Sequence, residues 1–128
     1  MKGTIKEQRS NHDAHDLLLG ILYYFPENAK WDELSFHEAL YKISKNYKVL
    51  KFLKFKELSG NLYCEDLGKV FDLLELSGIL TRRNEFTELD VKLIQSFFDE
   101  EIKQTFPENE INSIEEIADE LKNLLLQN

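Results

Sequence analysis

Apolar residues recur every three or four positions along most of the chain, which is the spacing of amphipathic helices. In the first half, this pattern predicts a helix that is capped by Ser10 or Asn11 and ended by Pro26. Its apolar stripe consists of Leu17, Leu18, Ile21, Leu22 and Phe25. A second helix is expected from about Leu34. Its single buried face carries Phe36, Leu40, Ile43, Tyr47 and Leu50.

The pattern becomes less regular after the second helix. Residues 49–56 combine apolar residues with regularly spaced lysines, and they either end that helix or form a short strand before a turn at residues 59–61. A third helix is expected over residues 65–77, and Gly78 closes it in the left-handed conformation. Apolar residues then flank a polar turn, which predicts a small hairpin near residues 79–87.

Two more helices are expected in the last third of the chain. Thr87 with Asp90 resembles a capping box and opens a fourth helix, which Pro107 ends. The stripe of this helix consists of Leu89, Leu93, Ile94, Phe97, Phe98 and Ile102. Ser113 with Glu116 forms a second capping box and opens the last helix. The apolar residues of that helix are Ile114, Ile117, Leu121, Leu124 and Leu125.

These elements predict a mainly α fold, with one five-helix domain over residues 1–128 and a small β-hairpin. The composition agrees, because 42% hydrophobic and 12% aromatic residues supply a core that disordered chains lack. Residues 1–10 are polar, and we expect them to be flexible. No apolar run is long enough to span a bilayer, and the single Cys64 has no disulfide partner in the chain. We therefore expect a cytoplasmic protein without membrane contact.

Charge is unevenly distributed along the chain. Residues 41–56 carry six lysines and no acid in a protein of net charge −8, whereas residues 84–128 carry twelve acids and three lysines. The lysines follow a three-residue repeat and one further position: Lys42, Lys45, Lys48, Lys51, Lys54 and Lys56. This spacing spreads them around a helix and alternates them on a strand, so neither geometry forms a narrow phosphate track. Three interpretations stay open: a solvated helix face, nucleic acid, or an acidic protein surface, which residues 99–120 of the same molecule or of a second copy offer.

One segment resembles part of a known fold. Residues 63–89 read YCEDLGKVFDLLELSGILTRRNEFTEL, in which a helix ends in Leu-x-x-Ser-Gly-Ile-Leu and continues into a short hairpin. This segment, 27 of the 128 residues, resembles the end of a winged-helix domain. It is also similar to small, mostly helical bacterial proteins found with mobile elements or defence systems. Those proteins begin the helix with Tyr-Ser-x-x-Leu, where this chain has Tyr63 and Cys64.

The resemblance implies a role for the helix before the hairpin, because that helix enters the major groove in DNA-binding winged helices. Its charges oppose such a role, since one base, Lys69, is accompanied by four acids, namely Glu65, Asp66, Asp72 and Glu75. Only the turn residues Arg82, Arg83 and Asn84 suit contact with a phosphate backbone. A winged-helix-like domain with these charges is expected to use the fold for protein contacts.

Candidate chemistry is sparse. His12 and His15, with Asp13 and Asp16 at a helix start, are residue types that Zn²⁺ or Ni²⁺ accepts, but a fourth ligand would have to come from a distant residue. We interpret the two acids as helix-terminal charges and the two histidines as exposed. Cys64 has acidic sequence neighbours that disfavour a thiolate and has no evident histidine partner. We expect no metal, no cofactor and no catalytic activity.

The function expected from the sequence is a non-catalytic protein-interaction or accessory, regulatory module of a bacterial cytoplasmic system. The partner is another protein or a second copy of the chain, and the candidate partner helix is the last one, through Ile114, Ile117, Leu121, Leu124 and Leu125. The alternative is a winged-helix-like nucleic-acid-binding regulator that uses the basic residues 42–56.

Overall fold

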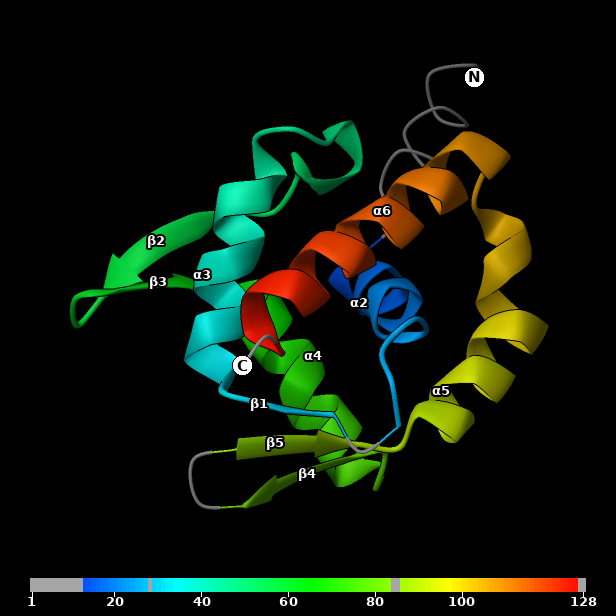
Figure 1. Cartoon of the computed structure of the whole chain (residues 1–128), viewed down its shortest axis with the longest axis horizontal. Helices are drawn as coiled ribbons and strands as arrows, with labels where there is room; N and C mark the ends of the chain where they lie inside the picture. Colours follow the sequence, from blue (N-terminus) through cyan, green and yellow to red (C-terminus); the bar gives the residue numbers. More distant parts are fainter. Residues whose placement is uncertain (1–12, 28, 84–85, 127–128) are drawn as a thin grey trace.

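The five expected helices are all present, which confirms the mainly α fold. The computed structural model describes residues 13–27, 29–83 and 86–126 (Figure 1). The α-helices in these ranges are α2 (Ala14–Leu22), α3 (Glu33–Ser44), α4 (Glu65–Leu76), α5 (Val91–Phe97) and α6 (Glu108–Leu125). Three short turns of other helix types are the 3₁₀ turn η1 (Lys48–Leu50), the π-helical η2 (Phe98–Ile102) and the 3₁₀ turn η3 (Lys103–Thr105). None of these described helices is both long and apolar enough to cross a membrane.

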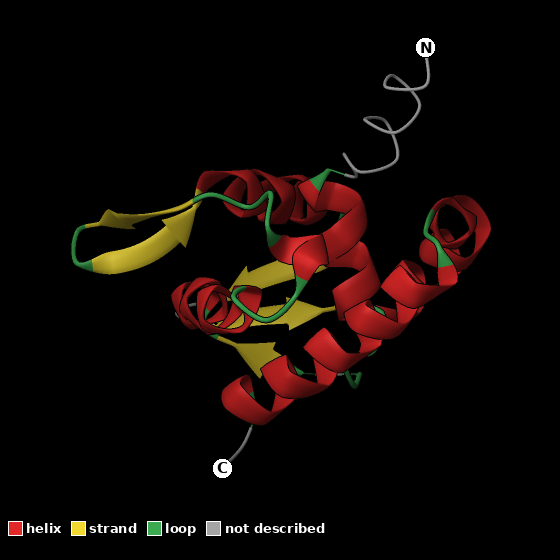
Figure 2. Ribbon diagram, turned by 90° about the horizontal axis from the view of Figure 1, so that it is seen from above, coloured by secondary structure: helices red, strands yellow, loops and turns green. Residues whose placement is uncertain are grey.

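Two small antiparallel sheets accompany the helices in the described residues. The first has the strand order β1-β5-β4 and consists of β1 (Lys30–Trp31), β4 (Leu80–Arg83) and β5 (Phe86–Leu89). Strands β4 and β5 confirm the hairpin expected near residues 79–87 and place Leu80 opposite Leu89. The second sheet is a hairpin of β2 (Phe55–Leu58) and β3 (Asn61–Cys64), which projects from the helices in Figure 2.

Helix α2 lies at the centre of the core and is packed against α4, α5 and α6 (Figure 1). Every residue from 17 to 22 is buried, so both sides of this helix face protein. A Cβ atom added to Gly20 would lie 3.1 Å from Cε1 of Phe98 and 3.3 Å from Cγ2 of Ile114. Because both neighbours would have to move, the glycine is what allows η2 and α6 to approach α2 this closely.

The described part of α2 begins at a cap other than those expected. The carboxylate of Asp13 accepts a hydrogen bond from the backbone N–H of Asp16 at 3.0 Å, which makes Asp13 the N-cap. Ser10 and Asn11, as well as the expected flexibility of residues 1–10, lie outside the described residues.

Helix α3 ends earlier than its apolar spacing predicts. It stops at Ser44, whose hydroxyl donates to the carbonyl of Tyr41 at 2.7 Å, a local bond that competes with helix continuation. The expected second-helix face therefore ends at Ile43, and Leu50 reaches the core from η1 instead. Residues 49–56, left open between helix and strand, begin in the 3₁₀ turn and end in β2.

The fourth helix begins later than expected, because the residues predicted to open it belong to strand β5. Thr87 lies buried in β5 and caps no helix, and Leu89 belongs to the same strand. Asp90 alone caps α5, because its carboxylate accepts the backbone N–H of Leu93 at 3.2 Å. Leu93 and Phe97 are exposed, since only one of two interleaved apolar sets can face α2. The set that does so is Ile94, Phe98 and Ile102.

The last helix is longer than predicted. Helix α6 begins at Glu108, directly after Pro107, whose backbone (φ −63°, ψ 155°) suits the residue that precedes a helix. The expected cap, Ser113, therefore lies within the helix. The capping-box pattern was wrong here because the proline already provides the boundary.

Candidate functional site

Helix α4 carries Leu76, the most exposed large hydrophobic residue of the described part of the chain. Its inner side packs into the core, and Gly78 ends it with a positive φ of 80°, as expected. The outer side carries Lys69, Leu73 and Leu76, which are four and three residues apart and therefore share one face. Leu73 is 52% exposed and Leu76 is 84% exposed. Large apolar side chains this exposed on one helix face are typical of interaction surfaces.

A groove of about 390 Å³ runs beside this face, between α4 and the N-terminal end of α2. Its apolar walls include Phe52, Val70 and Leu73. Its charged rim includes Asp13 of the α2 cap and Asp66 of the first turn of α4. Leu73 therefore belongs both to the exposed helix face and to the groove, which makes the two one continuous surface.

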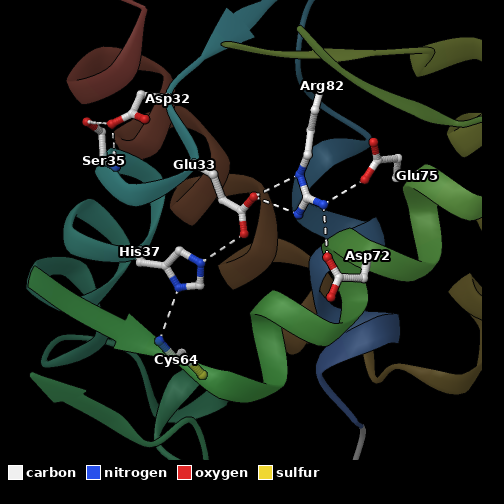
Figure 3. Close-up of polar contacts among 8 residues, drawn as sticks. All are labelled: Asp32, Glu33, Ser35, His37, Cys64, Asp72, Glu75 and Arg82. Atoms are coloured by element: carbon white, nitrogen blue, oxygen red, sulfur yellow. Dashed lines mark hydrogen bonds and ion pairs between the residues drawn. The ribbon is translucent and has the colours of Figure 1, made fainter. Parts of the chain in front are cut away.

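The other side of α4 is tied to the sheet by Arg82 of β4 (Figure 3). The guanidinium donates to Glu33 through Nε at 3.1 Å and Nη2 at 2.7 Å. Through Nη1 it donates to Asp72 at 2.9 Å and to Glu75 at 2.7 Å. Burial acts to lower the pKa of Arg82, but the hydrogen bonds to Asp72, Glu33 and Glu75 outweigh it and raise the pKa. One cation thus joins β4, α3 and α4.

This network corrects the role expected for the hairpin arginines. Arg82 was predicted to suit a phosphate backbone, but it lies in a strand and its donors are engaged by three carboxylates. Its guanidinium therefore has no pair of free N–H groups with which to bind a phosphate. Arg83 ends β4, and its side chain lies outside the described part of the structure, as does Asn84.

His37 extends the network into the core and was not recognised as important from the sequence. Its side chain is fully buried, and Nδ1 accepts the backbone N–H of Cys64 at 3.1 Å. Since Nδ1 is an acceptor, Nε2 carries the proton of the neutral ring and faces Oε2 of Glu33 at 3.4 Å. The ring also stacks on Tyr63 at 4.5 Å between centroids. The only sequence signal was the four-residue spacing of Glu33 and His37 at the start of the second expected helix.

Cys64 is positioned as a structural residue. It is fully buried at the end of β3, and this burial raises the pKa of its thiol above the usual range. A thiol held in the neutral form is a poor nucleophile. The contact of Cys64 with His37 runs through its backbone N–H and leaves the sulfur uninvolved.

The lysines of the lysine-rich segment, residues 42–56, are exposed but distributed over several elements. Its lysines come from α3, the residue after α3, η1, the connection to β2, and β2 itself. Lys56 lies 3.9 Å from Glu65, and both side chains are 64% exposed. Within the described residues, no carboxylate lies within 4.0 Å of the other five, Lys42, Lys45, Lys48, Lys51 and Lys54. The structure thus leaves these lysines exposed on several elements and does not order them into a stripe.

The acidic C-terminal region meets this segment through a tyrosine. Helix α6 packs against α3 and η1, and the hydroxyl of Tyr47 donates to Glu120 at 2.5 Å and to Glu116 at 3.4 Å. The hydrogen bond to Glu120, followed by burial, raises the pKa of Tyr47 above its ordinary value. The two oppositely charged regions are therefore neighbours in one molecule, although the contact is not an ion pair with the lysines.

The expected partner helix is largely used inside the chain itself. Ile114, Ile117 and Leu121 are fully buried, in a helix that packs on α2 and α3. These three residues form no surface for a partner, which corrects the prediction. Leu125 is half-buried, and Leu124 is 51% exposed. Helix α6 is amphipathic because its apolar side completes the core of this protein.

The metal-ligand candidates come together only in part. Ligand atoms of Asp13, His15 and Asp16 lie within 4.8 Å of one another, whereas His12 lies outside the described residues. Asp13 already caps α2, and Nδ1 of His15 lies 3.2 Å from Oδ1 of Asp16. The third histidine, His37, is buried in the network with Glu33 and adds no ligand to this group.

Comparisons of the chain with protein-family models, with curated proteins and with solved structures find no match. The features of the described residues that bear on function are therefore the exposed face of α4, the Arg82 network that holds this helix, and the exposed lysines.

Proposed function

We propose that this protein is a non-catalytic protein-interaction module, an accessory or regulatory component of a bacterial cytoplasmic system that binds its partner through α4. The observation that carries this proposal is the exposure of Leu73 and Leu76 on one face of α4. Full burial of a leucine side chain contributes about 1.5 to 3 kcal/mol. Leu76, 84% exposed, still has most of that free energy to gain from a partner.

The placement of α4 supports a winged-helix-like interpretation with an altered surface. The helix is followed directly by the β4–β5 hairpin, as in the resemblance of residues 63–89. In a DNA reader, the corresponding face would carry basic and amide side chains. Here Asp72 and Glu75 flank the leucines and are held in place by Arg82. An apolar face beside ordered acids suits a protein surface and repels phosphate.

Site-specific photo-crosslinking tests the proposal directly. Benzoylphenylalanine replaces Leu73 or Leu76 in cells that make the protein, and Leu124, which is 51% exposed on α6, serves as the control position. We expect adducts with protein from positions 73 and 76 and none from position 124. Absence of an adduct at both α4 positions would overturn the proposed function.

A nucleic-acid-binding regulator is the second candidate function. It is favoured by one observation, the five exposed lysines that have no carboxylate within 4.0 Å among the described residues. Titration of a labelled duplex at two salt concentrations separates the candidates, because phosphate contacts weaken steeply with salt. If the lysines are only solvated surface residues of an interaction module, we expect no salt-sensitive binding of the duplex.

A further inference from the structure

We propose that the partner of α4 is a basic amphipathic helix of another protein, which lies in the groove between α4 and the N-terminal end of α2. Its apolar side covers Leu73 and Leu76, and its lysine or arginine side chains pair with Asp13 and Asp66. This step rests on the function proposed above and names the chemistry of the partner.

Exposed apolar side chains adjoin the groove at two of its walls. Leu76 follows Leu73 one turn further along α4. On the α2 side, His15 lines the groove and meets the ring of Phe97 edge-on, with the ring centroids 6.3 Å apart. Phe97 is 43% exposed, and Leu93, one turn earlier on α5, is 49% exposed. A partner seated in the groove therefore lies next to exposed apolar side chains of both α4 and α5.

The groove itself is acidic. Among the described lining residues, Asp13 and Asp66 are acids and none is a lysine or arginine. Within the described part of the chain, no lysine or arginine nitrogen lies within 4.0 Å of either carboxylate. Asp13 accepts one backbone N–H as the cap of α2, which occupies one of the roughly four acceptor sites of a carboxylate. Both aspartates can therefore accept hydrogen bonds from the cations of a partner.

Asp66 differs from two other acids of α4 in this respect. Arg82 binds Asp72 at 2.9 Å and Glu75 at 2.7 Å, so their charges are compensated within the chain. Asp66 lies on the groove side of the helix, where the described residues supply no such cation. Lys69, one turn further on, is exposed and does not line the groove. A cation for Asp66 is therefore what a partner can add.

These charges decide which occupant fits. A nucleic acid or an anionic membrane would meet like charge in the groove. A second copy that used the same patch about a two-fold axis would set aspartates against aspartates. The exposed leucines of α4 form a ridge of the kind that packs against a facing helix, and a helix laid in an apolar groove is a recurring mode of recognition. A basic amphipathic helix supplies both the apolar side chains and the cations.

A pair of designed peptides tests the chemistry of the partner. One peptide of about 18 residues has leucine at helical spacing and lysine elsewhere, and the other replaces every lysine with glutamate. Fluorescence anisotropy of each labelled peptide is measured against the full chain at about 50 and 200 mM salt. We expect the lysine peptide to bind, more weakly at the higher salt, and the glutamate peptide not to bind. No binding of the lysine peptide up to about 1 mM protein, or equal binding of the two peptides, would overturn the proposal.

Charge variants distinguish the groove from general attraction of a lysine peptide to a chain of net charge −8. Asp13→Asn combined with Asp66→Asn removes both charges, and asparagine preserves the cap of α2. We expect this double variant to bind the lysine peptide about tenfold more weakly. The control, Glu38→Gln combined with Glu115→Gln, removes the same charge from exposed positions of α3 and α6 and should bind like the wild type. An equal loss of affinity in the two double variants would overturn the groove as the site.

The apolar contact has a matched pair of variants of its own. Leu73 is 52% exposed beside the groove, and Leu124 is 51% exposed on α6. We expect Leu73→Ser to weaken binding of the lysine peptide by about tenfold or more, because the leucine can no longer be buried by the peptide. Leu124→Ser should leave the affinity unchanged. Equal effects of the two substitutions would contradict the placement of the peptide.

The crosslinking experiment separates failure of this inference from failure of the proposed function. An adduct from position 73 whose crosslinked segment combines helically spaced apolar residues with lysine or arginine supports both. An adduct with an acidic or uncharged segment, or with a second copy of the chain, keeps the interaction function and overturns the basic partner. Absence of adducts at positions 73 and 76 overturns both.

Discussion

Nδ1 of His37 accepts a hydrogen bond from the backbone N–H of Cys64 at 3.1 Å, across 27 residues of sequence. The bond lies at the junction where β3 becomes α4, and Cys64 is the N-cap of that helix. The other ring nitrogen faces Glu33, which in turn binds Arg82. A continuous polar path therefore connects the start of α4 to the hairpin that follows it, which fixes the helix that carries the proposed interaction face.

Replacement of His37 tests how much this bond stabilises the fold. His37→Leu removes the acceptor and leaves the buried N–H of Cys64 unsatisfied, so we expect a loss of about 1 to 3 kcal/mol in the free energy of unfolding. His37→Asn keeps an acceptor near the position of Nδ1 and should be more stable than His37→Leu. Urea denaturation followed by the fluorescence of the single, buried Trp31 measures both. Equal stability of the wild type and His37→Leu would contradict the assigned role.

Arg82 should stabilise the fold without serving nucleic acid. Arg82→Met leaves the half-buried Glu33 without its cation, and we expect a loss of about 1 to 2 kcal/mol, reduced by partial solvent access. The control is Lys92→Met, whose exposed pair with Glu27 at 3.6 Å should contribute at most about 1 kcal/mol. Thermal unfolding of both variants checks this order, and a larger effect from Lys92 would disprove it.

Gly68 is expected to resist a change that normally stabilises helices. Alanine in a helix interior is favoured over glycine by about 0.5 to 1 kcal/mol. At Gly68, however, an added Cβ would lie 2.8 Å from Cζ of Tyr63 and closer still to its hydroxyl. Because Tyr63 is stacked on His37, Gly68→Ala should instead cost about 1 to 3 kcal/mol. The cost should shrink when Tyr63→Ala is combined with it, which a double-mutant cycle of unfolding free energies measures.

The Tyr47 hydroxyl provides a pH-dependent prediction. Its pKa is raised in the folded state, so its contribution to stability is fully present below the unfolded pKa of about 10 and is lost as pH rises through the folded pKa. The wild type should be more stable than Tyr47→Phe at neutral pH, and the difference should decrease above about pH 10. Urea denaturation across this range measures it. A difference that grows with pH would contradict the hydrogen bond from Tyr47 to Glu120.

The sequence predicted what local periodicity determines and missed what distant contacts decide. The helices followed from apolar spacing, and the hairpin near residues 79–87 from its polar turn. Two interleaved stripes around α5 could not be ranked, because only packing against α2 selects Ile94 over Leu93. The partners of Arg82 come from α3 and α4, up to 49 residues away, so no local pattern shows that its charge is engaged. The groove next to Leu73 likewise forms from separate segments.

The exposed lysines decide between the two candidate functions. If they bind phosphate, Lys45→Ala combined with Lys48→Ala should lower duplex affinity and flatten its dependence on salt by about one unit of slope per lost contact. The double variant Lys92→Ala and Lys103→Ala loses the same charge on exposed residues outside the lysine-rich segment and is the matched control. Fluorescence anisotropy of a labelled duplex at about 50 and 200 mM salt measures both slopes. A general charge effect lowers the duplex affinity of both variants alike. Only a loss of affinity confined to the Lys45 and Lys48 variant would therefore favour the regulator over the interaction module.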